Sequence, residues 1–346
     1  MLDDLNYIKQ HDPEDALAVA AGEYAQDEYD AVVANEEHDG RHITSIVVAG
    51  MGGSGLAAVL AKAWLKQDID VPFEILRGYD LPAYVGPHTL VIASSYSGNT
   101  EETLSCLVQA QEKGSQIASI AAGGQLIDIA NAQTIAYVPV PQHLQPRMAM
   151  IYNLRALIAI FVTFGIVGKD KYDEIKAAEL SMKAQSDTWK ADVPTEQNYA
   201  KQIALLSVGK TPVFYGGTLS APVAYKWKIS WNENAKNVAF WNEYPEFNHN
   251  EFLGWTSHPI EKPFAVFDLI SNFEHPQILK RFSVSDSLLS GMRPKATVIN
   301  LVGDSPIQQM LWGCILADFA SIYVAILNGV DPTPVAIIEK LKKELV

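Results

Sequence analysis

The stretch ITSIVVAGMGGSGLAAVLAKAWL, residues 43–65, begins as an apolar run rich in β-branched residues and passes through a cluster of glycines into an alanine- and leucine-rich run. The first part is typical of a buried strand and the last part of a helix. The glycines between them let the backbone turn sharply and come close to a ligand. We therefore expect a strand, a turn and a helix in this order, which is the repeating unit of parallel α/β folds.

The same alternation continues along the chain. In the first half we expect further strands at 74–78, 89–95, 116–123 and 134–140 and a helix at 99–114. A charged helical stretch at 169–194 follows, and the alternation then resumes with strands at 211–217, 264–272 and 296–303 and a helix at 275–289. Strands that alternate with helices predict parallel sheets covered on both faces.

The glycine turns GMGGSGLAAV and YGGTLSAPVA have a similar layout of glycines, a serine and small residues that open a helix. This similarity indicates two diverged copies of one unit. We predict an α/β protein of two tandem domains, each a doubly wound, flavodoxin-like parallel sheet with helices on both faces. The first, 1–190, would include leading helices and a linker helix, and the second, 191–346, a C-terminal helix.

Composition narrows the classes of partner. The 346 residues carry a net charge of −14, which argues against binding to nucleic acid or to an anionic membrane. The acidic start is unlike a signal peptide, and the long apolar runs 148–167 and 310–327 carry Arg155 and Asp318, so they indicate buried helices. Two distant cysteines in apolar contexts favour reduced thiols and a cytoplasmic location.

The glycine turn GMGGSG could bind an anion at the start of its helix, or it could simply be a tight turn. It lacks the lysine of a P-loop and does not fit the dinucleotide pattern G-x-G-x-x-G. A second turn, SSYSGNTEET at 94–103, offers the hydroxyls of Ser95, Ser97 and Thr100 at a helix start. Three hydroxyls there suit the oxygens of a phosphate monoester, although Thr100 alone would also be an ordinary helix cap.

The SSYSGNTEET turn resembles the phosphate loop of the sugar isomerase (SIS) domain, and the chain as a whole resembles the short bifunctional phosphoglucose/phosphomannose isomerases of archaea and bacteria. Besides that loop, the resemblance rests on the motifs VAGMGGSG, QPRMA (145–149), WNENAK (231–236), NEYPEFNHNE (242–251) and NGVDPTPVAIIEKLK (328–342). It implies two SIS domains and a substrate phosphate bound by Gly53, Ser54, Ser95, Ser97 and Thr100. The implied reaction converts glucose 6-phosphate, and mannose 6-phosphate as well, into fructose 6-phosphate through a cis-enediol, without a metal or cofactor.

The resemblance also implies the catalytic groups. Glu233 would move the proton between C1 and C2, Arg147 would stabilise the enediolate, and His249 and Lys342 would open the sugar ring. Glu233 ends the helix launched by the second glycine turn, a position that we expect to point at a substrate cleft. The alternatives are a solvated role for Glu233, with Glu243, Glu246 or Glu251 as the base, a structural role for His249, a surface ion pair for Arg147, and Lys340 or Lys343 in place of Lys342.

The segment FWNEYPEFNHNEFLGW, 240–255, has neither a helical nor a strand period. In the family the histidine reaches the active site of the neighbouring subunit, so the resemblance implies a homodimer. We expect the aromatic residues of the segment, Phe240, Trp241, Tyr244, Phe247, Phe252 and Trp255, to seal the interface. The alternative functions are another SIS-domain sugar-phosphate isomerase and a non-catalytic sugar-phosphate-binding protein.

Overall fold

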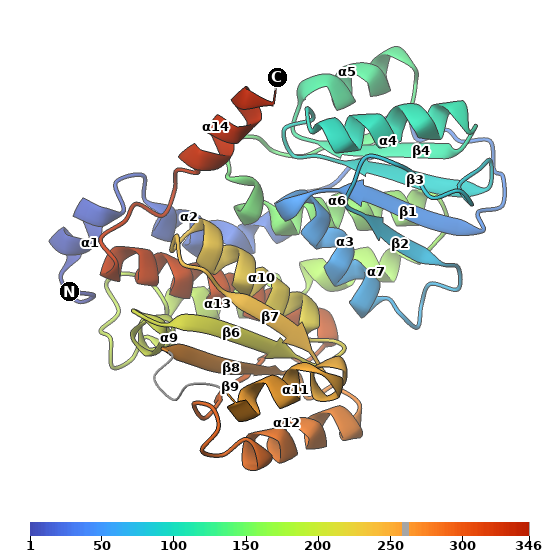
Figure 1. Ribbon diagram of the computed structural model, residues 1–346. Coiled ribbons are helices and arrows are strands. Elements are labelled where there is room, and N and C mark those ends of the chain that lie inside the picture. Colours follow the sequence, from blue (N-terminus) through green and yellow to red (C-terminus); the bar gives the residue numbers. More distant parts are fainter. Residues whose placement is uncertain (258–262, 346) are drawn as a thin grey trace. The chain divides into compact units, whose positions relative to one another are not determined.

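The computed structural model describes residues 1–257 and 263–345, which form two compact units (Figure 1). The N-terminal unit is Ala25–Leu180. The C-terminal unit combines Met1–Tyr24 with the residues from Ser181 onward, so the first helices of the chain pack with its second half. The domain division near residue 190 stays a prediction.

The sheet of the N-terminal unit is parallel throughout and has the strand order β2-β1-β3-β4-β5. Its strands are β1 (Ser45–Gly50), β2 (Phe73–Leu76), β3 (Thr89–Ser94), β4 (Gln116–Ala121) and β5 (Ala136–Pro139). Every residue of β1 and β3 is buried, because helices cover both faces of the sheet (Figure 1). The helices of this unit include α3 (Gly52–Trp64), α4 (Glu101–Glu112), α5 (Gly124–Ala132), η2 (Pro146–Met148), α6 (Met150–Thr163) and α7 (Lys169–Lys176), and α8 (Glu179–Asp187) begins at its end and belongs mostly to the C-terminal unit. This is the expected doubly wound, flavodoxin-like order.

The C-terminal unit repeats this topology with one strand fewer, in the order β7-β6-β8-β9 and again parallel. Its strands are β6 (Thr211–Gly216), β7 (Phe240–Glu243), β8 (Phe264–Ile270) and β9 (Thr297–Asn300). Its helices include α1 (Leu5–His11), α2 (Ala16–Gly22), α9 (Tyr199–Ser207), α10 (Ala221–Glu233), α12 (Pro276–Leu288), α13 (Pro306–Leu327) and α14 (Ala336–Glu344). The shared order supports the duplication inferred from the two glycine turns.

Helix α13 forms the centre of the C-terminal unit. It is long and apolar enough to cross a membrane by length and composition, but 94% of its most apolar window is buried inside the fold. Helices α9 and α10 both pack against it. The apolar run at 310–327 is therefore a core helix, as its central Asp318 indicated.

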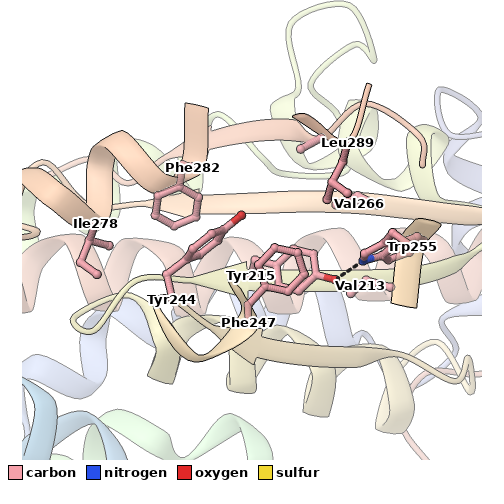
Figure 2. Close-up of a cluster of buried hydrophobic side chains, with 10 residues drawn as sticks. Val213, Tyr215, Tyr244, Phe247, Trp255, Val266, Ile278, Phe282 and Leu289 are labelled. Atoms are coloured by element: carbon pink, nitrogen blue, oxygen red, sulfur yellow. Dashed lines mark hydrogen bonds between the residues drawn. The ribbon is translucent and has the colours of Figure 1, made fainter. Parts of the chain in front are cut away.

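The aromatic segment 240–255 folds differently from our expectation. It contains the edge strand β7, the short helix η3 (Glu246–His249) and the turn α11 (Glu251–Gly254). Tyr244, Phe247 and Trp255 are buried in the core of their own unit, where they pack with Tyr215 and Phe282 (Figure 2). The prediction that these three aromatic residues seal a subunit interface is wrong, because the segment folds back over β6 and against α12.

Two apolar side chains of the same segment do remain at the surface. Phe240 is 55% exposed and Leu253 is 71% exposed, on either side of His249 in the sequence. Single exposed apolar residues are common on protein surfaces. Phe240 and Leu253 are therefore available for a contact with another protein chain, whereas the three buried aromatic residues of the segment are not.

A carboxylic acid is buried at the edge of this aromatic core. Asp268 lies on β8, where it pairs in register with Tyr215, and it is 1% exposed. Burial raises the pKa of Asp268 to about 7; the guanidinium of Arg293 acts in the opposite direction and the nearby Asp286 adds to the rise. In the unfolded chain such a carboxyl titrates near pH 4, so ionising Asp268 in the folded protein costs stability.

We expect this cost to appear as a pH-dependent difference between the wild type and an Asp268→Asn variant. A raised pKa contributes stability that is present below about pH 4 and is lost as pH rises through about 7, and the amide has no such loss. Between pH 5 and pH 8.5 the variant should therefore gain on the wild type by on the order of 2–3 kcal/mol. Chemical denaturation at both pH values measures the difference, and a difference that does not change with pH would contradict this account.

Candidate functional site

Two turns of the N-terminal unit meet at one edge of its sheet. Strands β1 and β3 are parallel neighbours, with Gly50 opposite Ser94, so the glycine turn after β1 and the serine turn after β3 leave the sheet side by side. The strand order reverses between these two strands, and this is where open α/β sheets bind their ligands.

The three hydroxyls predicted to bind a phosphate come together in the second turn. The Oγ of Ser95 lies 2.7 Å from Thr100 Oγ1 and 3.4 Å from Ser97 Oγ, and the amide of Gly98 donates to it at 3.1 Å. Ser95 is buried, whereas Ser97 is exposed. Ser95 therefore shapes the turn, and Ser97 and Thr100 are the hydroxyls that a ligand can reach.

Thr100 is the N-cap residue of α4, but its side chain does not act as a cap. In the described part of the chain its hydroxyl makes no hydrogen bond to the first amides of α4, because it bonds to Ser95 instead. The helix start thus keeps both its positive dipole end and donors that an anion could use. The capping alternative for Thr100 does not describe this structure.

Gly98 makes this turn possible. Its φ is +70°, and a Cβ added to it would lie 1.7 Å from the carbonyl oxygen of Gly123. No other residue fits there, since the turn is pressed directly against the backbone that precedes α5. Asn99 fastens the contact by accepting a hydrogen bond from the amide of Gln125 at 3.0 Å.

Gly53 and Ser54 lie in the glycine turn and contact the two neighbouring segments, the serine turn and η2. The Oγ of Ser54 accepts a hydrogen bond from the amide of Tyr96 at 2.8 Å, which ties the two turns together. A Cβ on Gly53 would lie 2.6 Å from the carbonyl oxygen of Pro146 and 2.9 Å from the amide nitrogen of Arg147. Both residues thus have a packing role, and their contact with a phosphate stays a prediction.

Arg147 belongs to the same unit and is held beside the glycine turn. It lies in η2, is 2% exposed and donates to Gln145 Oε1 at 3.4 Å. A buried guanidinium needs partners, so the alternative of a surface ion pair does not fit this position. The N-terminal unit therefore combines a hydroxyl-lined turn, an uncapped helix start and a buried cation.

Glu233 lies in the C-terminal unit, at the last residue of α10. We expected the end of this helix to point at the ligand-binding edge of the sheet, and that reasoning is wrong. Helix α10 begins at the carboxyl end of β6 and runs back, so it ends at the amino end of the strands, where Asn237 donates to the carbonyl of Lys210 at 3.1 Å. Nearby, Lys236 bridges the carbonyl oxygens of Glu233 and Pro332 at 2.6 and 2.9 Å.

His249 lies at the opposite edge of the same sheet. It follows β7 at the end of η3 and is exposed, and in the described ranges no hydrogen bond to its ring is formed. Asn248 holds the turn on α12 through Ser285 at 2.8 Å and Arg281 at 3.0 Å. Because a strand rises about 3.3 Å per residue, the length of β6 separates His249 from Glu233 by roughly 15–20 Å.

The structure also shows where the predicted lysine and the carboxylates that compete with Glu233 lie. Lys342 lies on α14, where Lys340 and Lys343 are equally exposed, so the structure does not single out one lysine. Among the competing carboxylates, Glu243 and Glu246 are exposed. Glu251 hydrogen-bonds to the hydroxyl of Tyr215 and accepts from Asn242 at 2.7 Å, which gives it a structural role.

The second glycine turn is occupied by a side chain of the protein itself. Glu274 Oε1 accepts hydrogen bonds from the amides of Leu219 and Ser220 at 2.9 and 2.8 Å and from the Ser220 hydroxyl at 3.1 Å. A Cβ on Gly217 would lie 2.5 Å from this carboxyl group. The start of α10 is thus already filled by a carboxyl group, and an isolated glutamate in the sequence carries no signal of this role.

Within residues 1–257 and 263–345, no group of three or more His, Cys, Asp and Glu side chains is arranged to hold a metal ion. Cys106 and Cys314 are both buried and free, and burial raises the pKa of the Cys106 thiol to about 11.

Each of the two units matches a model of a known protein family. Residues 41–165 match the family model described as SIS domain, and residues 196–345 match the model described as bacterial phospho-glucose isomerase C-terminal SIS domain. Among solved structures, a glucose-6-phosphate isomerase like protein from Thermus thermophilus shares the fold with a TM-score of 0.66 at 15% identity, covering 99% of this chain and 98% of that one. Tagatose-6-phosphate ketose/aldose isomerase from Escherichia coli gives 0.62 at 16% identity, covering 94% and 90%.

Several curated proteins are more similar to this chain in sequence than these solved structures are. The bifunctional phosphoglucose/phosphomannose isomerase of Caldicellulosiruptor bescii is 36% identical, with 88% of this chain and 90% of the relative covered. The protein of the same name from Aquifex aeolicus is 31% identical, with 96% and 98% covered. A D-glucosamine-6-phosphate 4-epimerase of Sulfolobus acidocaldarius is 34% identical, but over only 61% of this chain and 64% of its own length.

The two helix starts lead to a direct prediction about anion binding. We expect a Thr100→Ala variant to bind inorganic phosphate about ten- to hundredfold more weakly than the wild type, since it loses a hydrogen bond to a charged ligand. Glu274→Gln is the matched control: its amide oxygen can still accept from Leu219 and Ser220, so phosphate affinity should not change. Isothermal titration calorimetry measures both, and equal affinities for Thr100→Ala and the wild type would refute a phosphate site in this turn.

Proposed function

Because the chain belongs to the family of bifunctional phosphoglucose/phosphomannose isomerases, we propose that it interconverts glucose 6-phosphate, and mannose 6-phosphate as well, with fructose 6-phosphate. The observation that carries the proposal is the N-terminal unit's combination of Ser97 and Thr100 at an uncapped helix start with the buried cation Arg147. Such a site suits a substrate that bears both a phosphate and a carbon centre where negative charge develops.

Substrate binding would begin at the phosphate. The hydroxyls of Ser97 and Thr100 donate to its oxygens, and the first amides of α4 add further donors and the helix dipole. None of these groups takes part in the carbon chemistry. They therefore supply binding energy that holds the sugar in place while other groups act on it.

The isomerisation itself is a proton transfer. In the aldose-to-ketose direction, the Glu233 carboxylate takes the proton from C2 of the open-chain aldose, the freed electron pair forms the C1–C2 double bond, and O1 takes up the negative charge of the cis-enediolate. The hydroxyl proton of O2 then passes to O1, the same carboxyl returns its proton to C1, and O2 becomes the carbonyl oxygen of the ketose; the reverse path uses the same groups. Arg147 would stabilise the enediolate oxygen, and no electron donor or acceptor is needed.

Ring opening comes before the proton transfer, and we assign it to His249 with Lys342. Glu233 and His249 lie at opposite edges of one sheet, and this separation argues against one chain directing both at one sugar. A second copy supplies the missing histidine in our proposal, which makes the protein a homodimer in which each site takes His249 from the partner. The exposed Phe240 and Leu253 are surface residues that such a contact would cover.

A second candidate activity comes from one relative of a different name. The similarity to a D-glucosamine-6-phosphate 4-epimerase covers 61% of the chain and concerns a sugar phosphate too, but another carbon of the sugar. An assay with both substrates separates the two activities.

We also propose that the protein works in the cytoplasm, where Cys106 and Cys314 would stay reduced as the free thiols of the structure.

The proposed activity is tested with purified protein and fructose 6-phosphate. We expect both glucose 6-phosphate and mannose 6-phosphate to form, and EDTA to leave the rate unchanged. A Glu233→Gln variant should keep the KM but lose about 10²–10⁴-fold in kcat, because the amide preserves the shape and cannot take the proton. Glu246→Gln is the control for an exposed carboxylate of the same unit. The proposal fails if the wild type does not turn over fructose 6-phosphate, and the assignment of the base fails if Glu246→Gln is the inactive variant.

A further inference from the structure

Glu233 occupies a position that is usually poorly ordered. The last turn of a helix lacks part of its hydrogen bonding and tends to fray, whereas a catalytic carboxylate must be held within about 0.5 Å of its working position. In this chain the next residue is Asn234, the C-cap of α10, and it is 1% exposed. Its side-chain amide donates to Ser321 Oγ at 2.9 Å on the neighbouring helix α13.

The same helix face carries two more groups directed at one carboxylate. Asp318 Oδ1, on α13, accepts from Lys226 Nζ and from Ser230 Oγ, each at 2.8 Å, and lies 3.4 Å from Asn234 Nδ2. Lys226 Nζ also lies 2.6 Å from Asp318 Oδ2. The residues 226, 230 and 234 are spaced by four, so they line one face of α10 and point together at Asp318.

The chain places a further acid in this cluster. Glu23, near the start of the chain, is 1% exposed, and burial together with the negative charge of Asp318 raises the pKa of Glu23 well above its usual range. Burial lowers the pKa of Lys226, but the carboxylate of Asp318 and the other acidic groups around the lysine outweigh this effect, and the net direction is upward. The ammonium group of Lys226 therefore faces the carboxylate of Asp318 at the centre of this cluster.

A buried ion pair of this kind is weak evidence for stability, because apolar residues of similar volume often stabilise a core as well or better. The Lys226–Asp318 pair also fixes the position of α10 along α13. Helix α10 ends one residue before Asn234, at the proposed catalytic base Glu233. Nothing in the isomerisation described above uses Lys226, Asp318, Ser230 or Ser321 directly.

We propose that Asp318 and Ser321 are positioning residues, which hold the last turn of α10 through Lys226, Ser230 and Asn234 and thereby fix Glu233. This inference rests on the proposed function, since it takes Glu233 as the base. The network acts on the placement of the carboxylate and does not touch the phosphate turn. Its loss should therefore lower kcat and leave KM unchanged.

The test compares serine-to-alanine substitutions that remove the same atoms from two buried helices. Ser230→Ala deletes a hydroxyl bonded to Asp318. Ser207→Ala is the control, because the hydroxyl of Ser207 is equally buried, also lies on a helix that packs against α13, and donates only to the carbonyls of Ile203 and Ala204 in its own helix. Asn234→Ala, which removes the link nearest to Glu233, is the stronger variant.

We expect Asn234→Ala to lose about ten- to hundredfold in kcat with fructose 6-phosphate, and Ser230→Ala a smaller part of that, at unchanged KM, while Ser207→Ala keeps the wild-type kcat. Hydrogen exchange gives a readout that does not depend on activity: the amides of 231–237 should exchange about tenfold faster in Asn234→Ala than in the wild type or in Ser207→Ala.

Two results would overturn the inference. One is unchanged exchange in residues 231–237 of Asn234→Ala; the other is a loss of kcat in Ser207→Ala as large as that in Ser230→Ala, which would reflect general destabilisation. A wild type without isomerase activity would instead refute the proposed function and with it the catalytic part of this inference, and exchange would still decide whether the network fixes the end of α10.

Discussion

The direction of the chain in a parallel α/β sheet is the constraint on which the account of this protein depends. All strands point their carboxyl ends to one edge, and the helix that follows a strand must return to the other. In the C-terminal unit this places His249, which follows β7, at one edge and Glu233, which ends α10, at the other. Two groups assigned to one reaction are thus held apart by the length of a strand, and the proposed dimer follows from that separation.

The duplication of the fold has been used differently in the two units. In the N-terminal unit the turn after β3 offers hydroxyls and free helix amides, and Gly98 lets it lie against Gly123. In the C-terminal unit the corresponding loop after β8 carries Glu274, whose carboxyl group fills the start of α10. One copy therefore leaves a helix start open, whereas the other has filled one with a side chain, and in the proposed mechanism it acts through residues at its edges.

Sequence reasoning reached the fold and the clustering of three hydroxyls in the turn after β3, because both depend on local patterns. Buried parallel strands are continuous apolar runs between glycine turns, and the three hydroxyls lie within six residues of one another. It missed β7 and the burial of Tyr244, Phe247 and Trp255, since a short edge strand followed by tight turns has no period to detect. It also could not find the partners of Glu274 and Asp318, which lie 54 to 55 and up to 92 residues away in the sequence.

The central claim, that each active site combines Glu233 of one chain with His249 of another, is tested most directly by complementation. Glu233→Gln and His249→Ala are first assayed alone on ring-closed fructose 6-phosphate, where both should be nearly inactive. After co-expression, about half of the dimers are mixed and each has one intact site, so we expect roughly a quarter of the wild-type activity. Activity that stays at the level of the two parents, after mass spectrometry has verified mixed dimers, would contradict the account and require His249 to act within its own chain.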